Sequence, residues 1–193
     1  MAQAKVLSIL LLTALLGAAL LACGGTESGS SPLDDLEANR LRIPKLGLDA
    51  HIVIKAIGGD SVFPEPGRDE VILYDFTQNP DLGGRPGQGN AIISGRGTIN
   101  GVPRLFTGME RLTKGDEVQL VWRDEAYLYE VTALCEAPPA AMSSVFAKTD
   151  LPVLTLIPAT SGSLNEPRLF VRAGIESDSI ASGCPPGTSS ARP

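Results

Sequence analysis

The sequence predicts an all-β fold, in which short strands form a sandwich or a small closed barrel. Runs rich in β-branched and aromatic residues recur along the chain, and glycine- and proline-rich stretches separate them. The chain has 193 residues, of which 43% are hydrophobic and 20% charged, so it can bury one core and favours one main domain. The predicted strands are 51–57, 91–94, 117–122, 127–134, 153–157 and 169–175.

Shorter patterns assign the connections between these strands. Asp124-Glu125 separates two of the runs and predicts a tight hairpin connection. Apolar residues recur at intervals of three from Phe106 to Leu112, which predicts a short helix or helical turn ending at Lys114-Gly115. Segment 79–90 contains several glycines and prolines close together, so we expect a loop there.

The N-terminus has the pattern of an export signal. Lys5 supplies a positive charge, and a mostly apolar stretch over 6–22 ends at Cys23. The alternative is an uncleaved membrane helix, but the stretch is at the short limit for crossing about 30 Å of hydrocarbon at about 1.5 Å per residue. We expect a lipoprotein signal peptide over 1–22 and lipidation of Cys23, which would hold the protein on the outer face of the cytoplasmic membrane.

Composition divides the rest of the chain into three parts. Residues 23–39 are rich in glycine and serine and then acidic, which predicts a flexible stalk. Residues 40–176 contain all the predicted strands and form the body. Residues 177–193 are rich in serine, glycine and proline, and we expect a tail that is disordered except near Cys184.

Charge and residue usage argue against several function classes. The net charge of -6 argues against a nucleic-acid partner, because neutralising phosphates needs a basic surface. One histidine and three cysteines provide no zinc tetrad, and we expect no metal and no cofactor. Gly83-Gly84 and the glycines from Gly87 to Gly89 precede a strand, which is the reverse of the order in a phosphate-binding loop.

The two cysteines outside the export signal leave two interpretations open. In an oxidising compartment Cys135 and Cys184 can form a disulfide that ties the tail to the body. Alternatively they are unrelated thiols, and Cys135 is a small core residue. Sequence separation alone does not decide between them.

Four segments in order resemble the class E and F sortases, which are cysteine transpeptidases and hydrolases of bacterial surfaces. Residues 42–50 are similar to their first strand, and 86–95 to the strand that leads into Gly-His. Residues 106–116 resemble their Phe-x-x-Leu-x-x-Leu-x-x-Gly-Asp segment, and 154–159 lie where the family has Leu-Thr-Leu-x-Thr-Cys. The resemblance implies an eight-stranded closed β-barrel with one or two short helices.

The same resemblance implies that the usual chemistry is lost. Ala159 lies where the family has its nucleophilic cysteine, Arg96 lies where it has its histidine, and Arg168 matches its arginine. A methyl group cannot attack a carbonyl, and a guanidinium stays protonated at any working pH. We therefore expect a catalytically inactive protein.

The residues that are kept suggest binding. Arg96, Arg168 and Thr160 are the candidate ligand-binding residues, because two guanidinium groups can grip a carboxylate. The expected partner is a peptide or a cell-envelope component, or a surface-protein assembly that the barrel supports. The alternative is a pure scaffold, in which Arg96 faces solvent or pairs with Asp75 or Asp81.

A second alternative is an active sortase-type enzyme with a relocated nucleophile. Ser94, Thr160, Ser161 and Cys135 are the candidates, and each would need a base beside it. The only histidine, His51, falls in the first predicted strand, where we expect an ordinary surface or strand residue.

Overall fold

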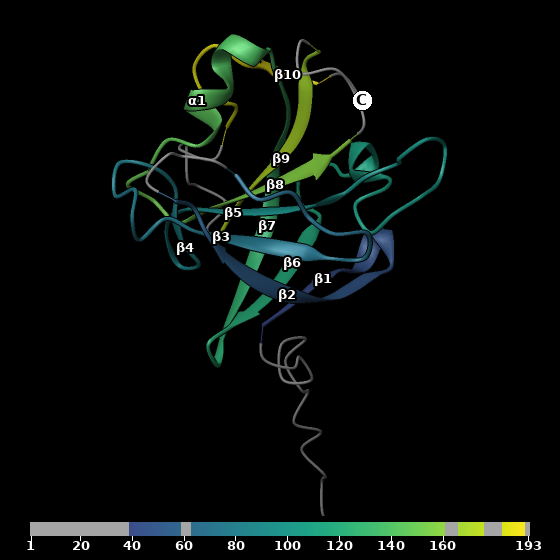
Figure 1. Ribbon diagram of the computed structural model, residues 1–193, viewed down its shortest axis with the longest axis horizontal. Coiled ribbons are helices and arrows are strands. Elements are labelled where there is room, and N and C mark those ends of the chain that lie inside the picture. Colours follow the sequence, from purple (N-terminus) through teal and green to yellow (C-terminus); the bar gives the residue numbers. More distant parts are fainter. Residues whose placement is uncertain (1–38, 59–62, 161–165, 176–182, 192–193) are drawn as a thin grey trace, which may run out of the picture.

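A closed barrel of eight strands forms the body of the protein (Figure 1). The structure is a computed structural model and describes residues 39–58, 63–160, 166–175 and 183–191. The eight strands are β1 (Arg40–Ile43), β2 (Leu48–Ala56), β3 (Val71–Asp75), β5 (Gln88–Arg96), β6 (Glu117–Trp122), β7 (Glu125–Ala137), β8 (Val153–Ala159) and β9 (Arg168–Gly174).

Neighbouring strands pair in the order β7-β6-β1-β2-β3-β5-β8-β9, and β9 pairs back to β7 to close the barrel. The β2–β3 and β5–β8 pairs are parallel, and the others around the barrel are antiparallel. Closure leaves these eight strands without a free edge. The predicted all-β fold and the eight-stranded barrel are both confirmed.

Short elements decorate the barrel. β4 (Gly84–Arg85) pairs with the start of β5, and β10 (Ser189–Ser190) pairs with β7. The α-helix in the described residues, α1 (Met142–Val145), follows the 3-10 turn η3 (Pro139–Ala141). Two further 3-10 turns are η1 (Pro44–Leu46) and η2 (Met109–Arg111), and η2 is the helical turn predicted from the apolar spacing.

Two apolar clusters explain why β5 and β8 are buried on both faces. One cluster fills the barrel and includes Ile93 and Leu156, whereas the other lies outside it, beneath α1, and includes Ile92 and Ile157. Because both faces are covered, the strands are nearly continuous apolar runs, as is usual where a parallel pair is buried. This double burial fixes the two strands whose ends form the site.

A buried polar network links three strands in the barrel. Arg172 Nη1 donates to Thr155 Oγ1 at 2.8 Å and to Asn90 Oδ1 at 3.2 Å, and the Thr155 hydroxyl donates to Asn90 Oδ1 at 2.6 Å. Asn90 Nδ2 in turn donates to the carbonyls of Val145 and Ala147, which hold the α1 segment against β5. Burial lowers the pKa of Arg172 to about 10, so this guanidinium is still charged at neutral pH.

Some sequence predictions need correction. The hairpin turn is Arg123-Asp124, one residue earlier than predicted, because both residues adopt the positive φ of 50° and 64° that a two-residue turn requires. Segment 79–90 is not all loop, since β4 forms inside it and β5 begins at Gln88. Strand β3 was absent from the prediction.

The disulfide is confirmed, and it holds part of the tail in place. Cys135 and Cys184 are bonded, with their Cα atoms 5.7 Å apart. Residues 183–191 fold back on the barrel, where β10 pairs with β7 and the Ser144 hydroxyl donates to the Pro186 carbonyl at 2.8 Å. The segment around Cys184 therefore packs on the barrel, and residues 177–182 and 192–193 of the predicted tail lie outside the described residues. The predicted signal peptide, Cys23 and the stalk up to residue 38 lie outside the described residues.

Candidate functional site

The ends of three strands meet at one end of the barrel. Arg96 and Ala159 are register partners at the carboxyl ends of the parallel strands β5 and β8. Arg168 begins β9, which runs antiparallel to β8, so it comes back to the same end. All three residues line one cleft of about 230 Å³, and exposed Thr160 lines it as well.

The floor and one side of the cleft are apolar. Tyr74 and Ile157 are only 6% and 5% exposed, and Met142 and Phe146, from the α1 segment, are half-buried. Phe63 lies against Phe146 with ring centroids 4.2 Å apart. The cleft therefore combines an aromatic and aliphatic surface with two guanidinium groups.

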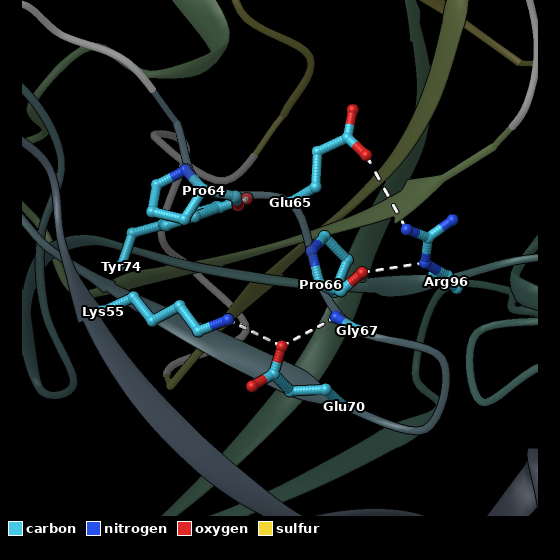
Figure 2. A network of polar contacts seen from close by, with 8 residues as sticks. All are labelled: Lys55, Pro64, Glu65, Pro66, Gly67, Glu70, Tyr74 and Arg96. Carbon is cyan, nitrogen blue, oxygen red and sulfur yellow. Dashed lines mark hydrogen bonds and ion pairs between the residues drawn. The ribbon is translucent and has the colours of Figure 1, made fainter.

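Residues Phe63–Gly67, here called the strap, form another wall of the cleft. Tyr74 Oη donates to the Pro64 carbonyl at 3.0 Å. Arg96 Nε donates to the Pro66 carbonyl at 2.8 Å, as Figure 2 shows. At the far end of the strap, the Gly67 amide donates to the Glu70 carboxylate at 2.7 Å, and the same oxygen accepts from Lys55 Nζ at 2.7 Å. The strap is thus tied down at three points.

The partners of Arg96 differ from those predicted. Its Nη2 lies 3.7 Å from Glu65 Oε2 of the strap, not beside Asp75 or Asp81. Asp75 ends β3, which is antiparallel to β5 and pairs Val71 with Gly95, so Asp75 lies toward the opposite end of β5. Asp81 precedes β4, which pairs with the start of β5, and is remote for the same reason.

Arg168 is half-buried, and within the described part of the chain its guanidinium has no hydrogen bond and no ion pair. Its charge still acts on a neighbour. Burial raises the pKa of the Tyr74 phenol, and the positive charge of Arg168 works in the opposite direction. The cleft therefore contains a cation whose charge is not balanced by a described acidic group.

The catalytic positions of the resemblance hold no nucleophile and no acid–base group. Ala159 presents a methyl group, and Arg96 presents a guanidinium, which is not a side chain that serves as a general acid or base. Ser94 is 3% exposed, and its hydroxyl donates to the Ile157 carbonyl at 2.9 Å. His51 is exposed on β2, as predicted, and does not line the cleft.

The other candidate nucleophiles fall into different places. Cys135 is bonded to Cys184, so it offers no free thiol. Thr160 lines the cleft, where the carboxylate among the described lining residues is that of Glu65. Ser161 lies outside the described residues.

The described residues contain neither a cluster of metal ligands nor a membrane-spanning helix. No group of three or more histidine, cysteine, aspartate or glutamate residues in this part of the chain is placed to hold a metal ion. None of the helices described is long and apolar enough to cross a membrane.

The strap is the part of the site that the sequence did not reveal. Its Phe-Pro-Glu-Pro-Gly composition is that of an ordinary connection, and its contact with Arg96 joins residues 30 positions apart. The signal that could have found it is the pair of prolines around Glu65, which indicates a stiff extended segment. No local pattern shows which part of the barrel such a segment contacts.

The comparison with family models decides the family. The model described as the sortase domain matches residues 41–176, well over half of the chain. The chain belongs to the sortase family. No curated protein shows a significant match to it.

Solved sortase structures share the fold. The sortase D5 transpeptidase of Clostridium perfringens superposes with a TM-score of 0.52 and 19% identity, over 71% of this chain and 77% of that one. Sortase C1 of Streptococcus agalactiae superposes with a TM-score of 0.53 and 19% identity, over 75% of this chain and 69% of that one. Sortase E1 of Streptomyces coelicolor was solved with a tripeptide in its active site. It superposes with a TM-score of 0.53 and 20% identity, over 71% of this chain and 86% of that one. The similarity at these identities establishes the fold.

Proposed function

We propose that this sortase-family protein binds an anionic peptide or another cell-envelope component in the cleft and does not catalyse transpeptidation. The observation that carries the proposal is the register pair Arg96 and Ala159. It puts a guanidinium and a methyl group where the family resemblance expects a histidine and a cysteine.

The missing chemistry follows from these side chains. Transpeptidation needs an atom that attacks the peptide carbonyl and a group that protonates the departing amine. The Ala159 methyl has no lone pair, and a guanidinium is a poor general acid. The buried Ser94 hydroxyl donates to the Ile157 carbonyl, and no hydrogen bond joins it to a described carboxylate or imidazole.

Binding is supported by the charges that the cleft retains. Arg168 has no described counter-ion, and the guanidinium of Arg96 lies 3.7 Å from a carboxylate that is itself 85% exposed. A planar guanidinium can grip a carboxylate or phosphate through two parallel hydrogen bonds. An anionic group of the ligand therefore fits this end of the cleft, and a peptide ligand also matches the tripeptide held by sortase E1 of Streptomyces coelicolor.

The proposed location is the outer face of the cytoplasmic membrane. It rests on the sequence pattern that ends at Cys23, with residues 23–39 as a stalk. The Cys135–Cys184 disulfide supports an exported protein, because disulfides persist in oxidising compartments. We also propose that the protein is closest in type to sortase classes E and F. This assignment rests on the sequence motifs, since structures of classes C, D and E superpose about equally well.

Cleavage of a panel of sorting-signal peptides tests the proposed loss of activity. The full chain in detergent micelles is compared with the double variant Ala159→Cys, Arg96→His. We expect the unmodified chain to leave every peptide intact and the double variant to cleave at least one. Turnover by the unmodified chain would overturn the proposal, and Thr160→Val would then show whether the Thr160 hydroxyl is the nucleophile.

A further inference from the structure

We propose that the cleft receives the last residue of a peptide chain, with its free α-carboxylate between Arg168 and Arg96 and its apolar side chain on the aromatic floor. The proposal rests on the proposed function and deepens it by naming the ligand class. Three features of the cleft carry it: the pair of cations, the apolar surface beside them, and the size of the space.

The cations favour a carboxylate. Arg168 begins β9 and Arg96 ends β5, so the two guanidinium groups come from different strands to the same cleft. Arg96 uses its Nε on the Pro66 carbonyl, and its Nη2 is too far from Glu65, at 3.7 Å, for a hydrogen bond. N–H groups of both side chains therefore remain for a planar anion.

The apolar floor favours a large hydrophobic side chain next to that carboxylate. Tyr74 and Ile157 are almost fully buried in the described chain, and Met142 and Phe146 complete the surface. The same cleft is lined by these four residues and by the two arginines. A ligand whose carboxylate and apolar group are attached to the same carbon satisfies both, and the final residue of a peptide has this arrangement at its Cα.

The volume favours the end of a chain over a chain that passes through. A cleft of about 230 Å³ is smaller than typical ligand pockets of roughly 300–1,000 Å³, so it suits a single residue better than a longer stretch of chain. The strap closes one side through its bonds to Tyr74 and Arg96, and the α1 segment forms another wall.

Glu65 acts as an internal competitor for the ligand. Its carboxylate lies beside Arg96, and its side chain is 85% exposed, so it can move into solvent when a ligand carboxylate arrives. Figure 2 shows the Glu65 and Arg96 side chains extending toward each other from the strap and from β5. Removing this carboxylate should strengthen ligand binding while leaving the strap anchored through Pro66.

Fluorescence anisotropy of labelled hexapeptides tests the inference with the full chain in detergent micelles. The probes end in leucine with a free carboxylate, in leucine amide, or in lysine with a free carboxylate, and a fourth has an internal aspartate and an amidated end. We expect the leucine acid to bind, and the other three to bind about tenfold more weakly or worse, because each lacks the carboxylate at the chain end or the apolar group.

Variants connect the binding to the named residues. Arg168→Gln should weaken binding of the leucine acid about tenfold or more. Arg168→Lys should have an affinity between those of the unmodified chain and Arg168→Gln, because lysine keeps the charge without the planar guanidinium. Glu65→Gln should increase the affinity several-fold, which corresponds to the interaction energy of one exposed ion pair. The matched control Arg111→Gln replaces an exposed arginine of the turn η2, outside the cleft, and should leave binding unchanged.

The outcomes separate this inference from the proposed function. Equal binding of leucine acid and leucine amide, or preference for the internal aspartate, overturns the inference but leaves an anion-binding cleft if Arg168→Gln still weakens the complex. If every probe binds, and Arg168→Gln changes the affinity of none of them, both the inference and the proposed function are overturned. No binding of any probe also overturns the inference, and cell-wall fragments then test the broader function.

Discussion

Arg96 and Ala159 are register partners across the parallel β5–β8 pair. Backbone pairing places them side by side whatever their side chains are, since it is the two strands that fix their positions. Both strands are buried on both faces, so a change at their ends does not need to disturb the barrel. The fold can therefore keep this juxtaposition whichever side chains occupy the two positions.

The buried network on Arg172 should depend more on Asn90 than on the arginine itself. Both are almost fully buried, and Asn90 accepts from Arg172 while its amide holds the α1 segment. Asn90→Ala should cost about 3 kcal/mol of unfolding free energy, because it leaves buried donors and acceptors without a partner. Arg172→Met should cost less, since it also removes the cost of burying a charge.

Denaturant unfolding of the two variants measures this order. Arg111→Met, an exposed arginine replaced in the same way, is the control and should have little effect. A larger loss for Arg172→Met than for Asn90→Ala would show that the charge, not the amide, organises the network.

The disulfide should stabilise the protein by constraining the unfolded chain. Its cysteines are 49 residues apart, which corresponds to about 4 kcal/mol in the chain-entropy model. Reduction should therefore lower Tm, and Cys184→Ser should show a lowered Tm that no longer responds to reductant. Scanning calorimetry with and without reductant measures both. Equal melting before and after complete reduction would mean that the β10 pairing alone holds the tail.

Six strands of the barrel could be predicted because their signals are local: β-branched runs and turn residues follow one another along the chain. The closed eight-stranded barrel itself was implied by the family resemblance. Strand β3 was missed because its five residues, Val71–Asp75, are nearly all buried and show no alternation. The missed β10 is only two residues long and depends on its pairing with β7.

The candidate site was predictable only in part. Arg96, Ala159 and Arg168 could be brought together through the family resemblance, and the structure places all three in one cleft. The strap could not be placed at the site from sequence, because its position depends on hydrogen bonds from Tyr74 and Arg96. These residues are 10 and 30 positions away from the carbonyls that they bind. The direction of β3 relative to β5 places Asp75 away from Arg96 and leaves Glu65 as its acidic neighbour. The charge pattern of the sequence does not reveal this direction.

Lipidation at Cys23 is a prediction from sequence that a single substitution can test. We expect the protein to incorporate a labelled fatty acid and to lose its first 22 residues. Cys23→Ser should abolish the label and leave the chain at its full mass. Cys184→Ser serves as the control, because it also removes one cysteine but should keep the label. A Cys23→Ser protein that has the same mass as the processed, unmodified protein and still partitions into membranes would contradict the assignment.

The anchor of the strap should weaken in acid. The hydrogen bond from Lys55, followed by that from the Gly67 amide, holds the pKa of Glu70 below its ordinary value of 4.5. A carboxyl group whose pKa is lower in the folded state than in the unfolded state stabilises the fold above the unfolded value. This contribution is lost as the pH falls from 4.5 through the folded value.

Glu70→Gln should therefore lower stability at pH 7 by about 1 kcal/mol or less, a Tm difference of up to about 4 °C, and the gap should narrow as the pH falls below 4.5. The neighbouring exposed carboxylate offers a matched control, Asp69→Asn, which should melt like the unmodified chain at both pH values. Thermal melts of the three proteins from pH 7 to pH 3 measure the effect. A gap that stays constant across this range would mean that Glu70 stabilises the strap through its shape and not its charge.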